Sequence, residues 1–484
     1  MDTSQILQEV DIELIGKQSP TLGVFDSLAL SARYNFTWEE YQLGAAFFAL
    51  NEQALPEVIK TILHETTHLY QMLSTPYGYY YHLVRSFQSN QAVVLWRILQ
   101  KKGTTKHPLM TAIARCRPRE AFPDLWFNLY LWYLAEIVLL YMEGNKDIYL
   151  RQRLNNPLFK GKPVVQCFAE LEACLAALLA ATGRNCDYVG HNLFIEGSRD
   201  EEMAMTALKA TGDFDVLSIL ESWAKTSEFW NSEIEGSSYS KYLFPSPLSI
   251  EQSRYYYLIE HAKPSIKTTD HRRFVWTYAA LCELSLFGPI LPQHSKLRSG
   301  KTTLAEIHPL SRFLSFLRTA AEIEPVRNLD SDYRRFIEEV CSAKAWPSPL
   351  AMNDGVAFHY PPQDLRSDLY HRAQALRARV PSAFIDLSCW YTPKNDFTKE
   401  LTYYFVHPVM EFSDKVLFHK DKTVVAFFIT QYAVNAYLRK FLLSDDLTVT
   451  LPFRSNSAAR ELCQDVLAYY LAAVGIGDRT IVVQ

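Results

Sequence analysis

The chain has 484 residues, a formal net charge of -4 and an apolar content of 48%. A chain of this length can bury one large or two ordinary hydrophobic cores, which fits an enzyme. Its charge is nearly balanced, and the short basic clusters at 115–119 and 271–273 are interpreted as solvated surface. These properties argue against a nucleic-acid partner.

The cysteines and the N-terminal residues indicate the cellular compartment in which the protein is expected. No two cysteines form a C-x-x-C pair, and the eight lie singly at positions 116, 167, 174, 186, 282, 341, 389 and 463. Residues 1–10 lack the basic and apolar regions of a secretory signal. We therefore expect a cytoplasmic protein with reduced thiols.

The first fifty residues predict a small N-terminal β-sheet. Val10, Ile12 and Leu14 alternate with acidic residues, which is typical of a strand. Gly44–Leu50 is a compact apolar run and predicts another strand, with an interior strand or the start of the next helix as alternatives.

The segment Pro56–Leu73 predicts a helix, because proline suits a first turn and apolar residues recur near one face. This helix carries an H-E-x-x-H motif formed by His64, Glu65 and His68. The i, i+4 spacing places both imidazoles on one face, where they can bind one Zn²⁺ beside the intervening carboxylate. The motif therefore indicates a zinc hydrolase.

A third protein ligand must come from a distant segment. The metzincin continuation of the motif is absent, since Gln71 and Ser74 occupy its positions. The best candidate is Glu196, on a helix predicted over 190–211, and Glu201 and Glu202 are the reserve candidates.

Asp200 lies one helical turn after Glu196. A carboxylate at that spacing can fix the second N–H of a metal-bound imidazole. His64-Glu65-x-x-His68 followed by Glu196-x-x-x-Asp200 resembles the gluzincins, the zinc metallopeptidases of the thermolysin-like zincin fold. The resemblance covers the two motif helices, and the 127 residues between His68 and Glu196 imply a long helical insertion, placed at 74–189.

The resemblance implies a peptidase with one zinc ion per chain, held by His64, His68 and Glu196. Glu65 would act as general base and then general acid. Gluzincins usually add a Tyr or His that stabilises the oxyanion, and Tyr256 and His261 are the candidates in the expected region. In a zincin the strand before the motif helix is an edge strand that binds an extended peptide, which predicts a peptide or protein substrate.

The rest of the chain is predicted to be mainly α-helical. Leu125–Met142 is almost long enough to span a bilayer, but it contains Asn128 and Glu136, so we expect a buried core helix and no membrane span. Helices are predicted at 119–143, 164–182, 214–230, 249–262, 271–287, 308–322, 330–343, 363–379, 423–443 and 458–473.

The proline-rich stretch 345–363 is the better predicted domain boundary, and 231–249 is the other candidate. The prediction is a zincin-like α+β catalytic region at 1–345 and a mixed α/β region at 346–484, with strands at Leu447–Phe453 and Thr480–Gln484. The alternative function is a zincin-like binding or regulatory protein with little or no peptidase activity.

Overall fold

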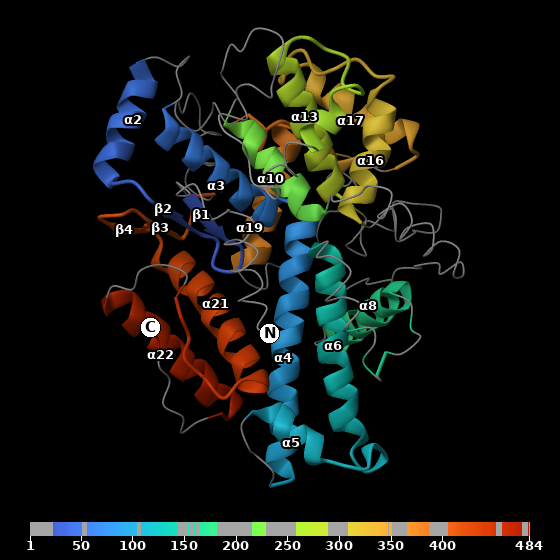
Figure 1. Ribbon diagram of the computed structural model, residues 1–484, viewed down its shortest axis with the longest axis vertical. Helices are drawn as coiled ribbons and strands as arrows, with labels where there is room; N and C mark the ends of the chain where they lie inside the picture. Colours follow the sequence, from blue (N-terminus) through green and yellow to red (C-terminus); the bar gives the residue numbers. More distant parts are fainter. Residues whose placement is uncertain are drawn as a thin grey trace.

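The computed structural model describes part of the chain, and the described residues are distributed over its whole length. They are 23–50, 56–103, 108–143, 153, 156, 158–159, 162, 164–181, 215–228, 258–288, 308–346, 348–350, 365–386, 405–451, 457–476 and 483. Most of them are helical, and a four-stranded sheet lies to one side (Figure 1). The predicted fold class, mainly α with a small sheet, is confirmed.

The sheet joins the two ends of the chain. Its order is β1-β2-β3-β4, with β1 and β2 antiparallel, β2 and β3 parallel, and β3 and β4 antiparallel. The strands are β1 (Gly23–Asp26), β2 (Ser31–Tyr34), β3 (Val409–Glu411) and β4 (Val416–Phe418). The predicted boundary near residue 345 therefore falls between the two strand pairs of one sheet.

The prediction of a strand at Gly44–Leu50 was wrong, because this run belongs to the helix α2 (Trp38–Leu50). A capping box starts the helix. The backbone N–H of Glu40 donates to the hydroxyl of Thr37, and the Glu40 carboxylate accepts from the backbone N–H of Thr37. This reciprocal pair favours a helix, and Phe47 of the apolar run remains 51% exposed on it.

The motif helix is present as α3 (Glu57–Ser74), and one residue, Thr75, separates it from the long helix α4 (Pro76–Lys101). Thr75 caps α4 by accepting from the backbone N–H of Gly78. A Cβ at Gly78 would lie 2.3 Å from the backbone oxygen of Met72, so only glycine permits this close approach.

α4 packs along α6 (Pro123–Glu143), and both run along the long axis of the molecule (Figure 1). Pro123–Met142 is the one described helical stretch with the length and composition of a membrane span, and 78% of its most apolar window is buried in the fold. It is the core helix that the sequence predicted.

Most of the remaining predicted helices are confirmed, with bounds within three residues of the prediction. They are α8 (Val164–Ala181), α10 (Val216–Ser227), α13 (His271–Leu286), α16 (Pro309–Ala320), α17 (Asp332–Ala343), α19 (Leu365–Arg379), α21 (Lys422–Leu443) and α22 (Ser457–Val474). Of the predicted C-terminal strands, the described part shows a single bridge between Val449 and Val483. The predicted helix over 190–211 and the strand-like run at 10–14 lie outside the described residues.

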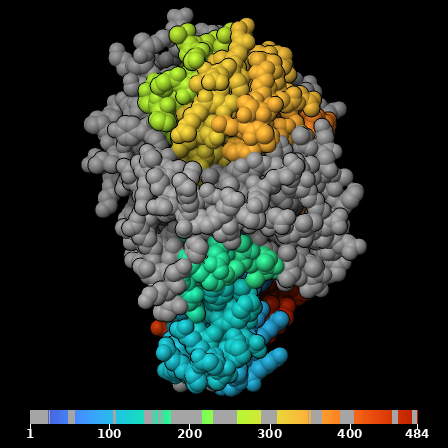
Figure 2. Space-filling view, turned by 90° about the vertical axis from the view of Figure 1, so that its right-hand side faces the viewer, coloured from blue at the N-terminus to red at the C-terminus, as the bar shows by residue number. Residues whose placement is uncertain are grey.

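On the face shown in the space-filling view, segments 258–288 and 308–346 lie at one end of the molecule, and α5 (Leu109–Arg115), α6 and α8 lie at the other (Figure 2).

The motif helix α3 packs against α10, α19, α4 and β1. The motif helix is thus enclosed by elements from both halves of the chain.

The C-terminal end of α3 is held by a buried arginine. Arg377 of α19 donates from Nη1 to the backbone oxygen of Ser74 at 3.0 Å and from Nη2 to the Ser74 hydroxyl at 3.1 Å. Its Nε and Nη2 donate to Glu283 of α13, which also accepts from the hydroxyl of Tyr333. Gln374 accepts the remaining Nη1 hydrogen and donates to the same Ser74 oxygen. All five donors of this guanidinium are therefore matched.

Candidate metal centre

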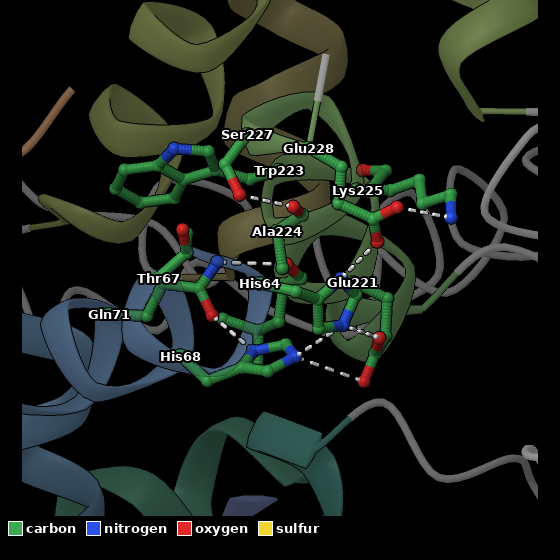
Figure 3. Close-up of polar contacts among 12 residues, drawn as sticks. His64, Thr67, His68, Gln71, Glu221, Trp223, Ala224, Lys225, Ser227 and Glu228 are labelled. Atoms are coloured by element: carbon green, nitrogen blue, oxygen red, sulfur yellow. Dashed lines mark hydrogen bonds and ion pairs between the residues drawn. The ribbon is translucent and has the colours of Figure 1, made fainter. Parts of the chain in front are cut away.

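The two motif histidines lie on the face of α3 that meets α10 (Figure 3). The Nε2 atoms of His64 and His68 are 3.2 Å apart. This separation follows from their spacing, since residues four apart on a helix share one face. His68 is buried, and the side chain of His64 is 18% exposed.

α10 provides a carboxylate at the same point. The helix starts at a capping box between Asp215 and Ser218, and Glu221 follows one turn later. The Glu221 carboxylate lies 3.2 Å from Nε2 of His64 and 3.4 Å from Nε2 of His68. One ligand atom from each of His64, His68 and Glu221 lies within 4.8 Å of the others.

The far nitrogen of each imidazole has its own partner. Nδ1 of His64 donates to Glu228 at 2.9 Å, and Lys225 holds the other oxygen of Glu228 at 2.6 Å. Nδ1 of His68 lies 2.8 Å from Oε1 of Gln71, whose amide nitrogen donates to the backbone oxygen of Leu220 on α10. Because Oε1 can only accept, Nδ1 of His68 carries the proton and its Nε2 is left as an acceptor. This is the tautomer that binds a metal through Nε2.

Opposing effects set the charges of the cluster. Burial lowers the pKa of His64, but hydrogen bonds to Glu221 and Glu228 outweigh it and raise that pKa to about 10. Burial raises the pKa of Glu221, and the neighbouring imidazoles His68 and His64 bring it well below its usual range. Without zinc, His64 is therefore an imidazolium that lies between the carboxylates of Glu221 and Glu228.

Glu65 lies on the same helix and is buried. Burial raises its pKa to about 7, although His64 and His68 oppose the shift. The strand β1 passes close to it, because a Cβ at Gly23 would lie 2.5 Å from Oε1 of Glu65. Two residues along β1, the ring of Phe25 stacks on His68 with centroids 5.7 Å apart.

The structure brings together three of the predicted site residues, His64, Glu65 and His68. Glu196, Asp200, Glu201, Glu202 and Tyr256 lie outside the described residues, so their roles stay predictions. His261 is described and is exposed, unlike the enclosed histidines of the cluster, which does not favour an oxyanion role for it.

Glu221, Glu228 and Gln71 are site residues that sequence reasoning missed. Glu221 and Glu228 are seven residues apart, which places them two turns apart on one helical face. This seven-residue spacing is the feature of the sequence that could have indicated these two residues. It differs from the Glu-x-x-x-Asp spacing that favoured Glu196.

Comparison of the chain with family models, with curated proteins and with solved structures found no match.

The donor set fits zinc. Two imidazole nitrogens and one carboxylate are the ligands of a common type of catalytic zinc site, which leaves a fourth position for water or substrate. Each histidine has the outer partner that such ligands usually need.

Proposed function

We propose that this protein is a zinc-dependent peptidase with a gluzincin-like His, His, Glu site, and that Glu221 is the third protein ligand. The observation that carries the proposal is the convergence of His64, His68 and Glu221 within 4.8 Å, with Nδ1 of both histidines held by separate acceptors.

A zinc ion bound there would supply a Lewis acid that polarises a carbonyl group and acidifies water. Glu65 accepts the proton of the attacking water and returns it to the leaving amine. Its burial suits this role, because desolvation raises the pKa of a carboxylate and makes it a stronger base toward water. Glu228 and Gln71 orient the two imidazoles.

The position of β1 favours a peptide substrate. β1 is an outer strand of the described sheet, and it passes beside Glu65 and His68 through Gly23 and Phe25. An outer strand can bind an extended peptide by main-chain hydrogen bonds. The edge-strand role that the sequence assigned to Gly44–Leu50 therefore passes to β1 in this proposal.

Zinc content tests the metal assignment. We expect about one zinc per chain by elemental analysis after dialysis in metal-free buffer, and loss of zinc in His64→Ala and Glu221→Ala. Glu57→Gln is the matched control, because Glu57 is an exposed carboxylate on the same helix. Zinc retained in Glu221→Ala and lost in Glu196→Ala would return the third-ligand role to Glu196. A folded protein without zinc would overturn the proposal.

Hydrolysis is measured separately, with a mixed peptide library and mass spectrometry. We expect cleavage by the zinc-loaded protein and none after chelation, with recovery on zinc addition. Stoichiometric zinc without cleavage of any peptide would refute the peptidase assignment while leaving the metal site intact.

A further inference from the structure

Arg366, in the first turn of α19, has a buried guanidinium without a hydrogen-bond partner. The residue is 8% exposed, and its Nε and Nη2 atoms are buried and unpaired. Its guanidinium lies over the ring of Phe428 at 5.3 Å, which supplies a cation–π contact and no acceptor. Burial lowers the pKa of Arg366 to about 9, which reflects the cost of enclosing this charge.

A second buried arginine lies on the helix that faces Arg366. Tyr370, one turn after Arg366, packs its ring on Tyr79 of α4 with centroids 4.8 Å apart. This contact turns the Arg366 face of α19 toward the first turns of α4. There Arg85 is 5% exposed and donates from Nε and Nη2 to the hydroxyl of Tyr81, each at 3.3 Å. Tyr79 and Tyr81 both interact electrostatically with Arg366, so Tyr81 is near both arginines.

Unpaired donors are in excess in this region. Gln88 accepts from Nη1 of Arg85 at 3.3 Å, which leaves its amide nitrogen buried and unpaired. Arg366 adds two further unpaired donors, and none of its described contacts involves a carboxylate. Enclosing an unpaired cation is strongly unfavourable, and charge-assisted bonds to an anion would offset that cost.

We propose that Arg366 and Arg85, with Gln88, form a binding site for a small oxyanion group, a phosphate or a carboxylate. Nε and Nη2 of Arg366 present two parallel N–H donors, the arrangement that matches two oxygens of one such group. Arg366 as a whole keeps 8% of its surface exposed, whereas these two donors are buried, so the ligand must reach them below the surface. This site is separate from the metal centre and does not depend on the proposed function.

Thermal unfolding and calorimetry of the full chain test the site. Sodium phosphate and sodium acetate are titrated against sodium chloride at constant ionic strength, so that only specific binding raises the melting temperature. We expect a saturable increase in melting temperature with at least one of the two salts, and the salt that responds shows whether the site prefers a phosphate or a carboxylate.

Arg366→Met is expected to weaken binding about tenfold or more. Arg366→Lys keeps the charge but loses the paired donors, so its affinity should lie between those of the parent and of Arg366→Met.

Arg372→Met is the control, because Arg372 lies on the same helix and is 39% exposed. It should keep the full response, and so should His64→Ala, which separates this site from the metal centre. Arg366→Met should also be at least as stable as the parent in chloride, because it removes an unpaired buried charge. Absence of a saturable response to either salt, or an undiminished response in Arg366→Met, would overturn the proposal.

Discussion

The middle of α3 and its C-terminal end carry buried polar clusters of opposite character. At Ser74, the five donors of Arg377 meet acceptors on Ser74, Glu283 and Gln374, and the cluster satisfies itself. At His64 and His68, two ring nitrogens face each other at 3.2 Å with the Glu221 carboxylate beside them. Those three groups are acceptors once His64 is neutral.

The balance of donors and acceptors in a buried polar cluster indicates whether the cluster needs a ligand. A cluster whose donors and acceptors balance joins helices, and it needs nothing from outside the chain. A cluster of converging acceptors is complete only with a proton or a cation. We therefore assign the cluster at Ser74 to stability and the cluster at His64 and His68 to chemistry, and mutations should separate the two.

The largest expected effect is on hydrolysis. Glu65→Gln removes the proposed base without removing a ligand, so we expect activity to fall about a hundred- to ten-thousand-fold while zinc content is unchanged. Initial rates on a cleaved library peptide and elemental analysis measure both. Activity close to that of the parent would remove Glu65 from the mechanism.

The next largest effect is on the free energy of unfolding, and it comes from the cluster at Ser74. Arg377→Met leaves Glu283 as an unpaired buried charge, so the free energy of unfolding should fall by about 3–5 kcal/mol in urea titrations. Arg334→Met is the control and should change it little, since both partners of the Arg334–Glu338 pair are 53% exposed. The folded Arg377→Met protein should still bind one zinc. If Arg377→Met lost zinc without losing stability, the roles assigned to the Ser74 cluster and to the His64 and His68 cluster would be wrong.

A smaller effect is expected from the residue that orients His68. Gln71→Leu removes the acceptor at Nδ1 and the link to the Leu220 oxygen, and zinc affinity should weaken about 10- to 100-fold. Competition with a chromophoric chelator measures this. If affinity is unchanged, the tautomer of His68 is set by another group.

The smallest effect, for a change of one pH unit, is the dependence of zinc binding on pH. The pKa of His64 rises from 6.5 to about 10 in the zinc-free protein, so zinc must displace a proton between these values. Affinity should increase about tenfold per pH unit between pH 7 and 9, with about one proton released per zinc. Calorimetry in buffers of different ionisation enthalpy counts the protons.

The same shift acts on stability with the opposite sign. A raised His64 pKa stabilises the zinc-free protein fully below pH 6.5, and this contribution is lost as the pH rises toward 10. The zinc-free protein should therefore become less stable with rising pH over the range in which zinc binds more tightly. A zinc affinity independent of pH would exclude a protonated His64.

The helices could be predicted from the sequence to a large extent, because the apolar period of α16 or α17 shows on its own which face is buried. α2 was missed because its apolar run was interpreted without the capping box at Thr37 and Glu40. The pairing of β2 with β3 could not be predicted, since strands of three or four residues carry too little pattern to specify a distant partner.

For the site, the sequence identified what lies within one helix. His64, Glu65 and His68 are fixed relative to one another by helical geometry alone. Glu221 becomes their neighbour only when α10 packs on α3, and no local spacing encodes that contact. Motif resemblance favoured Glu196 because it carries the expected Asp four residues later, whereas the acid that accompanies Glu221 comes seven residues later.

α19 links the proposed oxyanion site to the helix that bears the metal-centre histidines. Gln374 and Arg377 near its end bind the last residue of α3, and Arg366 in its first turn bears the unpaired donors. Occupancy at one site and affinity at the other are then joined by thermodynamic reciprocity. Whatever factor an oxyanion contributes to zinc affinity, zinc must contribute to oxyanion affinity, so two independent titrations would have to agree on one coupling free energy.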